Sequence, residues 1–88
     1  MYWVYVIENP HGKLYKGYTN NIVLRICEHN AGRVASYTRG RGPWKLVYSE
    51  EWRSKIEAVA REKFLKSGKG REFLRKHILL SASQTLPE

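Results

Sequence analysis

The sequence has 88 residues, 42% of them hydrophobic, and 16 lysines and arginines against 8 acidic residues give a formal net charge of +8. This length supports one small domain; all the acids are glutamates, which excludes the aspartate clusters of most two-metal nucleases. The single cysteine, Cys27, excludes a disulfide framework and a multi-cysteine zinc site. The longest apolar run, residues 2–7, is too short for a membrane span or a signal peptide, so we expect a cytoplasmic protein.

Hydrophobic periodicity and turn residues divide the chain into strands and helices. Aromatic and β-branched residues 2–7 indicate a strand covered on both faces, and Pro10 and Gly12 favour a turn into a return strand. Asn20 is the expected N-cap of the first helix, which Gly32 ends. The next helix is expected to bury one stripe of apolar residues, Ile56, Val59, Ala60 and Phe64.

The order of elements predicts an α/β (α+β) fold with a small, three-stranded, mainly antiparallel sheet flanked by about three helices. The elements expected in chain order are strands over 2–7 and 13–19, a helix over 21–30, a strand over 44–49, and helices over 52–66 and 71–80. We expect residues 1–80 to form the single domain and residues 81–88 to form a flexible C-terminal tail.

The positive charge is concentrated between residues 9 and 49, where aromatic side chains are interleaved with it. Basic residues mixed with aromatics suit a phosphate backbone with bases available for stacking, although a solvated cationic face is the alternative. We expect DNA as the partner, with RNA left open, and no membrane contact. The residues expected to bind nucleic acid are Lys16, Arg33, Tyr37, Arg39, Arg41 and Lys45.

Two tyrosines lie on opposite arms of the expected hairpin. With the turn centred near residues 10–11, Tyr5 and Tyr15 come close to opposite one another. Two phenols on one sheet face beside cations could approach a phosphate together, and ordinary core packing of both rings is the alternative. A glycine within the strand, Gly17, often permits the close approach of another group.

Three further side chains could carry chemistry on the helices. Arg25 and His29 are four residues apart and share one helix face, where an arginine can grip a phosphate and a histidine can relay a proton. A solvated helix edge is the alternative for both. Glu62 borders the buried stripe, and it either pairs with Lys66 or serves as the sole protein ligand of Mg²⁺. We expect Cys27 to be a core thiol.

The order of these groups resembles that of the GIY-YIG nuclease domain, and it looks closest to the small stand-alone bacterial members. The first motif reads Trp3-Val4-Tyr5, without its glycine, and the second reads Tyr15-Lys16-Gly17, with lysine in place of isoleucine. The likeness continues through Thr19-Asn20, Arg25 and His29 to the segment that ends at Glu62, and it covers about residues 2–80.

The resemblance implies a metal-dependent endonuclease that hydrolyses DNA phosphodiester bonds, structure-specific in repair or recombination. It assigns Tyr5 and Tyr15 to the site, one of them as the general base, with Arg25 clamping the scissile phosphate, His29 assisting proton transfer, Glu62 holding a single Mg²⁺ or Mn²⁺ ion, and Gly17, Thr19 and Asn20 shaping the site. An ordinary tyrosine, with a pKa of about 10, is a poor base, and a nearby metal ion, Arg25 and Lys16 would favour its phenolate.

A nucleic-acid-binding module that uses the same basic face without efficient cleavage is the second hypothesis. We expect no separate targeting domain at this length, so an active nuclease would need restraint from the shape of its substrate or from a protein partner. Replacing Glu62 by glutamine distinguishes the two, because it abolishes cleavage and spares binding only in an enzyme.

Overall fold

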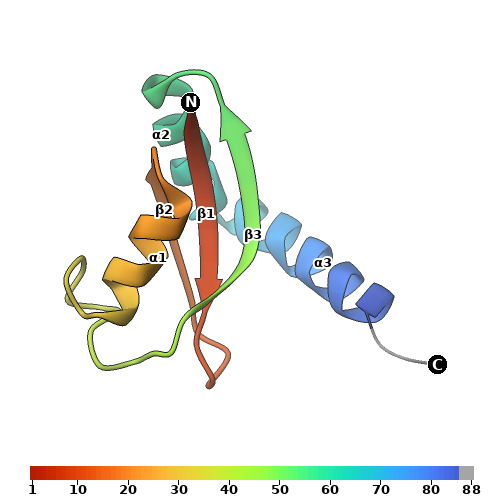
Figure 1. The fold of residues 1–88 in the computed structure, drawn as a ribbon. Coiled ribbons are helices and arrows are strands. Elements are labelled where there is room, and N and C mark those ends of the chain that lie inside the picture. The colour runs from red at the N-terminus through yellow and green to blue at the C-terminus, as the bar shows by residue number, and fades with distance from the viewer. Residues whose placement is uncertain (86–88) are drawn as a thin grey trace.

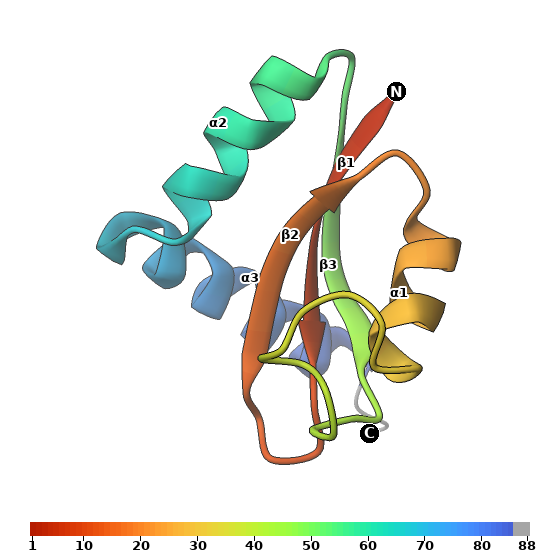
Figure 2. The same cartoon turned by 90° about the vertical axis from the view of Figure 1, so that its left-hand side faces the viewer.

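The computed structural model describes residues 1–85, and side chains up to Ile78. The chain forms β1 (Tyr2–Glu8), β2 (Leu14–Thr19), α1 (Ile22–Asn30), β3 (Lys45–Trp52), α2 (Lys55–Leu65) and α3 (Gly68–Thr85) (Figure 1). The strands lie in the order β2-β1-β3, and both pairs are antiparallel. Helix α1 covers one face of the sheet, while α2 and α3 lie on the other (Figure 2). The predicted fold class is confirmed.

The central strand β1 is buried on both faces, as its unbroken apolar sequence predicts. Val4 and Val6 pack against α2 and α3, in a core cluster that includes Leu65 and Leu74. The alternate side chains of β1 point the other way, where Tyr5 and Ile7 form a second cluster with Trp44. One strand therefore separates two small cores, and the functional groups on each side are positioned independently.

The first helix is capped by Asn21, one residue later than the sequence predicts. The Asn21 side chain accepts a hydrogen bond from the Leu24 backbone N–H, at 3.1 Å. Thr19 fixes the approach to this cap, because its Oγ1 accepts a hydrogen bond from the Asn21 N–H, at 3.1 Å. The prediction of Asn20 as the cap is therefore wrong, and this exposed residue is free to line a cleft.

Helix α2 is rotated about its axis relative to the predicted apolar stripe. Ala58 and Leu65 are its buried residues, whereas Ile56 is 82% exposed and Phe64 is 38% exposed. Ser54 caps the helix by accepting a hydrogen bond from the Glu57 N–H. The helix is consequently shorter than predicted and turns the face with Ala58 toward the sheet.

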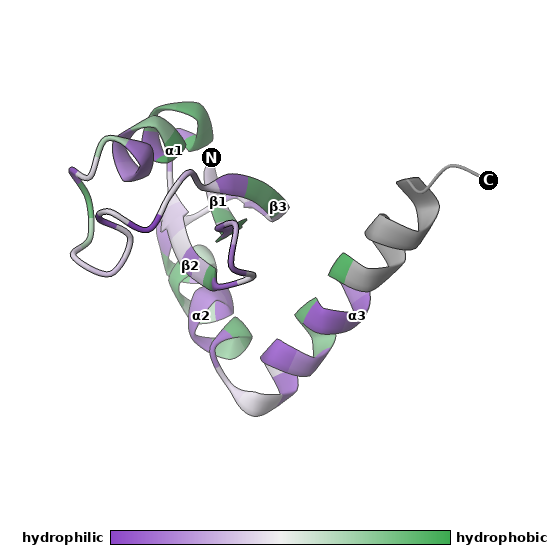
Figure 3. Ribbon diagram, turned by 90° about the horizontal axis from the view of Figure 1, so that it is seen from below, coloured by the Kyte–Doolittle hydropathy of each residue, from purple (hydrophilic) through white to green (hydrophobic). Residues whose placement is uncertain are grey.

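Helices α2 and α3 form a V joined at the segment that the sequence predicts to be a helix break (Figure 3). Ser67 accepts a hydrogen bond from the Gly70 N–H, so α3 begins at Gly68 instead of residue 71. A Cβ at Gly70 would lie 2.0 Å from the Phe64 carbonyl oxygen, which makes glycine necessary for this tight junction.

Helix α3 runs to Thr85, beyond residue 80 at which we expected it to end. Residues 81–85 of the expected tail are therefore helical, and residues 86–88 lie outside the described part of the chain. Among the described residues, no helix is both long enough and apolar enough to cross a membrane.

A partly buried ion pair fastens α2 to β3. The Arg61 guanidinium donates to both carboxylate oxygens of Glu50, with distances of 2.9 and 3.1 Å from Nε and 2.9 Å from Nη2. Tyr48 and Trp52 also donate hydrogen bonds to this carboxylate. Burial alone would raise the pKa of Glu50, but the hydrogen bonds from Arg61, Tyr48 and Trp52 outweigh it and lower the pKa.

We expect Glu50→Gln to lower the free energy of unfolding by about 2 kcal/mol at pH 7, because it leaves Arg61 without its partner. Since the pKa of Glu50 is lower in the folded than in the unfolded chain, the carboxylate stabilises the fold above its unfolded pKa. This contribution is lost as the pH falls through the folded pKa. Urea unfolding at pH 7 and at acid pH, with exposed Glu51→Gln as control, measures both effects. An equal loss in both variants, or a difference that persists in acid, would contradict the prediction.

Candidate active site

A cleft of about 380 Å³ opens at the edge of β2, where strands from the sheet meet α1 and α2. Its walls combine phenols, cations and one carboxylate, which are groups able to bind and polarise a phosphate. The residues that line it are Tyr2, Tyr5, Tyr15, Gly17, Tyr18, Thr19, Asn20, Arg25, Lys55 and Glu62. The residues that the sequence predicts as catalytic lie in this cleft, with the exception of His29, which is buried behind it.

Strand register places Tyr5 across a glycine. Tyr5 pairs with Gly17, whereas Tyr15 pairs with Ile7, so the two tyrosines are diagonal neighbours on one face, close to opposite as predicted, with a slightly shifted register. A Cβ at Gly17 would lie 2.5 Å from Tyr5 Oη and 2.7 Å from Cζ. Gly17 therefore leaves the space in which the phenol lies, and its predicted structural place beside the site follows from this contact.

A buried hydrogen-bond chain joins Tyr5 to the loop after α1. Tyr5 Oη lies 2.8 Å from His29 Nε2, and His29 Nδ1 lies 2.9 Å from Thr38 Oγ1. The Thr38 hydroxyl donates its proton to the Ala35 carbonyl at 3.1 Å, so it must accept from Nδ1–H. In a neutral imidazole Nε2 is then unprotonated and accepts the proton of Tyr5.

Burial keeps both members of this pair uncharged. It raises the pKa of Tyr5, with a further rise from the nearby Tyr15, while Arg25 acts in the opposite direction. Burial also lowers the pKa of His29, and the positive charge of Arg25 adds to that effect. At neutral pH the tyrosine therefore holds its proton, and the imidazole beside it is free to take one.

Trp44 and Asn30 hold the loop that carries Thr38. The indole Nε1 of Trp44 donates to the Thr38 carbonyl at 3.0 Å. The Asn30 side chain donates to the Trp44 carbonyl and accepts from its N–H. Thr38 is a site residue whose role the sequence does not predict, because a threonine in a glycine-rich loop gives no signal of the histidine that it orients.

Tyr15 and a loop tyrosine extend the aromatic surface beside His29. The Tyr15 ring contacts His29 edge-on, with 4.9 Å between ring centroids, and stacks on Tyr37 at 6.1 Å. The Arg41 guanidinium lies 4.8 Å from the Tyr37 ring centroid. Tyr37 and Arg41, both predicted to bind nucleic acid, thus lie next to the cleft, where an unpaired base could stack.

Arg25 and Glu62 approach the cleft from different helices. Arg25 lines it from α1 while pairing with Glu28, with 3.3 Å between Nε and Oε1. The Glu62 side chain, 15% exposed, lines it from α2 and pairs with Lys66 at 3.3 Å. The predicted pair with Lys66 is therefore present, and Glu62 also faces the cleft, while its service as a metal ligand stays a prediction.

The donor set fits one hydrated divalent ion. Within residues 1–85 the structure contains no group of three or more histidine, cysteine or acidic side chains that could hold a metal. A lone carboxylate such as Glu62 suits Mg²⁺ or Mn²⁺, because Mg²⁺ in particular retains several waters and shares substrate phosphate oxygens. Waters and a substrate phosphate would fill the remaining coordination positions of such an ion.

Comparison with known proteins assigns the family. Residues 1–76 match the model of the GIY-YIG catalytic domain. The chain belongs to the GIY-YIG family. It is also similar to small UPF0213 proteins from bacteria and archaea. One from Clostridium perfringens is 50% identical over 66 residues, covering 75% of this chain and 71% of the relative. One from Halobacterium salinarum is 52% identical over 62 residues, covering 70% and 80%.

A solved GIY-YIG relative supports the fold. The solution NMR structure of a UPF0213 protein from Bacillus halodurans has 40% sequence identity and a TM-score of 0.52. The similarity covers 86% of this chain and 84% of that one.

Lys16 lies on the opposite face of the sheet from Tyr5 and Tyr15 of this GIY-YIG domain. It pairs with Val6 and lines a groove with Arg71 and Leu74 of α3. The expectation that Lys16 favours a Tyr5 phenolate is therefore wrong, because successive side chains of β2 point to opposite faces. Of the cations considered for that effect, Arg25 is the one that lowers the pKa of Tyr5.

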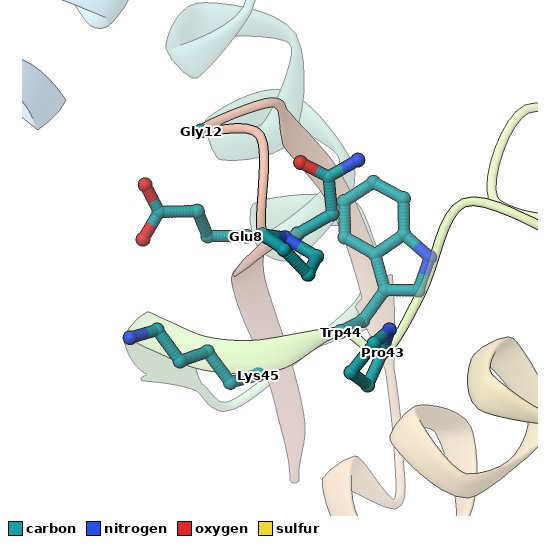
Figure 4. A pocket seen from close by; sticks show the side chains of 7 residues that line it. Glu8, Gly12, Pro43, Trp44 and Lys45 are labelled. Atoms are coloured by element: carbon teal, nitrogen blue, oxygen red, sulfur yellow. The ribbon is translucent and has the colours of Figure 1, made fainter.

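The remaining basic residues predicted to bind nucleic acid are dispersed. Arg33 is exposed just after α1, and Arg39 donates to the Gly32 carbonyl from the same loop as Arg41. Lys45 lies at another cleft, of about 420 Å³, together with Glu8 and Trp44 (Figure 4). That cleft has no phenol or guanidinium among its lining residues, so it lacks the groups that recommend the β2-edge cleft.

Two further observations change the predicted site. Cys27 is exposed, so the prediction of a core thiol is wrong. Tyr2, Tyr18 and Lys55 line the cleft although the sequence does not single them out. Lys55 is the first residue of α2. Whether its side chain reaches the cleft depends on the angle at which that helix meets the sheet, which periodicity does not determine.

We expect Gly17→Ala to break the contact between Tyr5 and His29, because the phenol is 1% exposed and cannot move aside without disturbing the core. Overpacking of this kind costs about 1–3 kcal/mol of stability. Chemical denaturation measures the stability, and the tyrosine hydroxyl and imidazole NMR resonances report the hydrogen bond. Gly68→Ala is the control, since a Cβ there meets open space. A fully stable Gly17→Ala variant with unchanged resonances would contradict the predicted clash.

Proposed function

We propose that this GIY-YIG protein is a metal-dependent endonuclease that hydrolyses DNA phosphodiester bonds. The observation that carries the proposal is the buried chain from Thr38 through His29 to Tyr5, which ends at a cleft that also contains Arg25 and Glu62. Membership of a catalytic-domain family supports phosphodiester chemistry, and the net charge of +8 supports a polyanionic substrate.

In this proposal Tyr5 is the general base, and His29 makes it effective. A water molecule attacks phosphorus while its proton passes to Tyr5 Oη, and the phenolic proton passes to His29 Nε2. The bond from phosphorus to the leaving oxygen breaks, and that oxygen takes up a proton from solvent water. The imidazolium returns its proton to solvent afterwards. The route avoids a free phenolate, which agrees with the raised pKa of Tyr5. Thr38 acts as a positioning residue, because it holds Nδ1–H and leaves Nε2 open.

Arg25 and Glu62 stabilise the charge that develops on the phosphate. The Arg25 guanidinium is suited to grip two phosphoryl oxygens, and Glu62 would hold a single Mg²⁺ or Mn²⁺ ion on the α2 side of the cleft. When bound, such an ion supplies positive charge close to the reacting phosphate. Glu62 would then exchange its contact with Lys66 for the ion.

The aromatic surface next to the cleft favours substrates with accessible bases. Tyr15 and Tyr37 form a stacked pair, and Arg41 lies over the second ring. Branched or flapped DNA offers unpaired bases to such a surface, so we propose a structure-specific substrate of repair or recombination, with RNA as the competing substrate to test. The cytoplasmic location and a targeting protein partner stay predictions from the sequence.

We expect Glu62→Gln to reduce metal-dependent cleavage by at least about 100-fold, because the variant lacks the carboxylate that would hold the ion. Nicking assays with Mg²⁺ or Mn²⁺ on duplex, single-stranded, flap and four-way DNA, and on matched RNA, measure this loss and the substrate preference. Glu72→Gln, an exposed glutamate on α3, is the control. Tight binding without cleavage by the wild type would identify a binding module and overturn the nuclease proposal.

We expect Thr38→Val to reduce kcat by about 10- to 100-fold, because valine cannot accept the Nδ1–H hydrogen bond that fixes the imidazole. Nitrogen NMR of His29 should show the lost preference for the Nδ1–H tautomer, whereas Thr38→Ser should retain it. In the wild type, cleavage should fall with decreasing pH at an inflection below 6.5, since the pKa of His29 is lowered from that value. Unchanged tautomers and rates in Thr38→Val would contradict the role of Thr38.

A further inference from the structure

A second group of cations lies on the face of the sheet opposite Tyr5 and Tyr15. Lys16 of β2 and two arginines of α3, Arg71 and Arg75, line a groove of about 260 Å³. Its floor is apolar, formed by Leu14, Leu74 and Ile78, and Glu8 is the acidic residue on its wall. Within the described residues, none of these three cations forms a salt bridge.

The groove is connected to the cleft through α2. Glu62 faces the cleft and pairs with Lys66, one helical turn further on. The Lys66 carbonyl accepts a hydrogen bond from Arg71 Nη1 at 3.1 Å, which ties the start of α3 to the end of α2. Lys66 thus links the groove to Glu62, through an ion pair of its side chain on one side and a hydrogen bond to its carbonyl on the other.

The cations in the groove repel one another in the free protein. Lys16 is partly buried, and burial lowers its pKa, with further lowering by the positive charges of Arg71 and Lys66. An anion seated between these side chains would relieve the repulsion. Charge complementarity therefore favours an anionic occupant, and continuity with the cleft favours one that also reaches Glu62.

We propose that Lys16 and Arg71 form a second phosphate seat that binds the nucleic-acid backbone beside the scissile phosphate, with Arg75 at its outer end. The apolar floor suits the carbon atoms of the sugars. This inference rests on the proposed nucleic-acid function and adds to it that the substrate is a polynucleotide gripped on both faces of the sheet edge. A small phosphodiester contacts only the cleft, so its affinity does not depend on the second phosphate seat.

The experiment measures DNA binding in a Glu62→Gln background, so it does not depend on cleavage. Fluorescence anisotropy of a labelled flap DNA at several salt concentrations compares Lys16→Gln/Arg71→Gln with Lys63→Gln/Lys76→Gln, which removes the same charge from exposed positions on α2 and α3. We expect the first pair to weaken binding about 10-fold and to lower the salt slope by about 2, because each lost phosphate contact lowers it by about 0.9. The control pair should change the slope by less than half as much.

A charge-retaining variant separates binding from folding. Arg71→Lys loses the hydrogen bond to the Lys66 carbonyl but keeps the positive charge, so it should retain most of the salt slope. With Glu62 restored, Lys16→Gln/Arg71→Gln should raise KM for flap DNA, whereas Lys63→Gln/Lys76→Gln should leave both this KM and the cleavage of bis(p-nitrophenyl) phosphate unchanged.

Three results would overturn the proposal. The first is an equal change of slope in both double variants, which would reduce the effect to net charge. The second is an unchanged slope in the Lys16→Gln/Arg71→Gln variant. The third is a Lys16→Gln/Arg71→Gln variant that binds a glutamate-rich peptide more weakly than the parent protein does but binds DNA equally well. The groove would then bind an acidic peptide. Failure of cleavage with binding as expected would overturn the nuclease proposal and support the phosphate seat.

Discussion

The register between β1 and β2 is the constraint on which the candidate site depends. It places Tyr5 opposite Gly17, where the missing side chain leaves room for a phenol to reach His29 Nε2 at 2.8 Å. A slip of β1 by one residue would turn Tyr5 to the other face of the sheet and put Val4 or Val6 in its place opposite Gly17. Backbone pairing and the packing on both sides of β1 thus fix the position of the Tyr5 phenol, independently of the charged groups in the cleft.

The elements packed on the two faces of β1 position different residues of the candidate site. On one face α1 supplies Arg25 and His29, and the loop after it supplies Thr38. On the other face α2 is fixed to β3 by Arg61, whose neighbour in sequence is Glu62. Adjacent residues of a helix point about 100° apart, so the helix that is anchored through one side chain presents the next to the cleft.

The sequence predicts the strand and helix order and several of the residues at the cleft, because buried strands and motif order leave clear patterns. It misplaces the register, since turn residues such as Pro10 and Gly12 do not define the pairing to a single residue. The rotation of α2 is missed because exposed Ile56 looks like a core residue. The prediction that Lys16 favours the phenolate conflicts with strand alternation, which groups Tyr15 with Gly17 on one face and places Lys16 on the other. Thr38 acts through a tertiary contact that periodicity cannot reveal.

The uncharged state of the Tyr5–His29 pair links binding to chemistry. Burial and Arg25 keep the imidazole neutral in the free protein, and burial keeps the phenol protonated. A phosphate gripped by Arg25 would offset the positive charge that opposes protonation of His29, so the imidazole would become a stronger proton acceptor when substrate is present. The same negative charge would oppose a free phenolate. Proton transfer through Tyr5 to His29, instead of prior loss of the tyrosine proton, is therefore the route that this arrangement of charges favours.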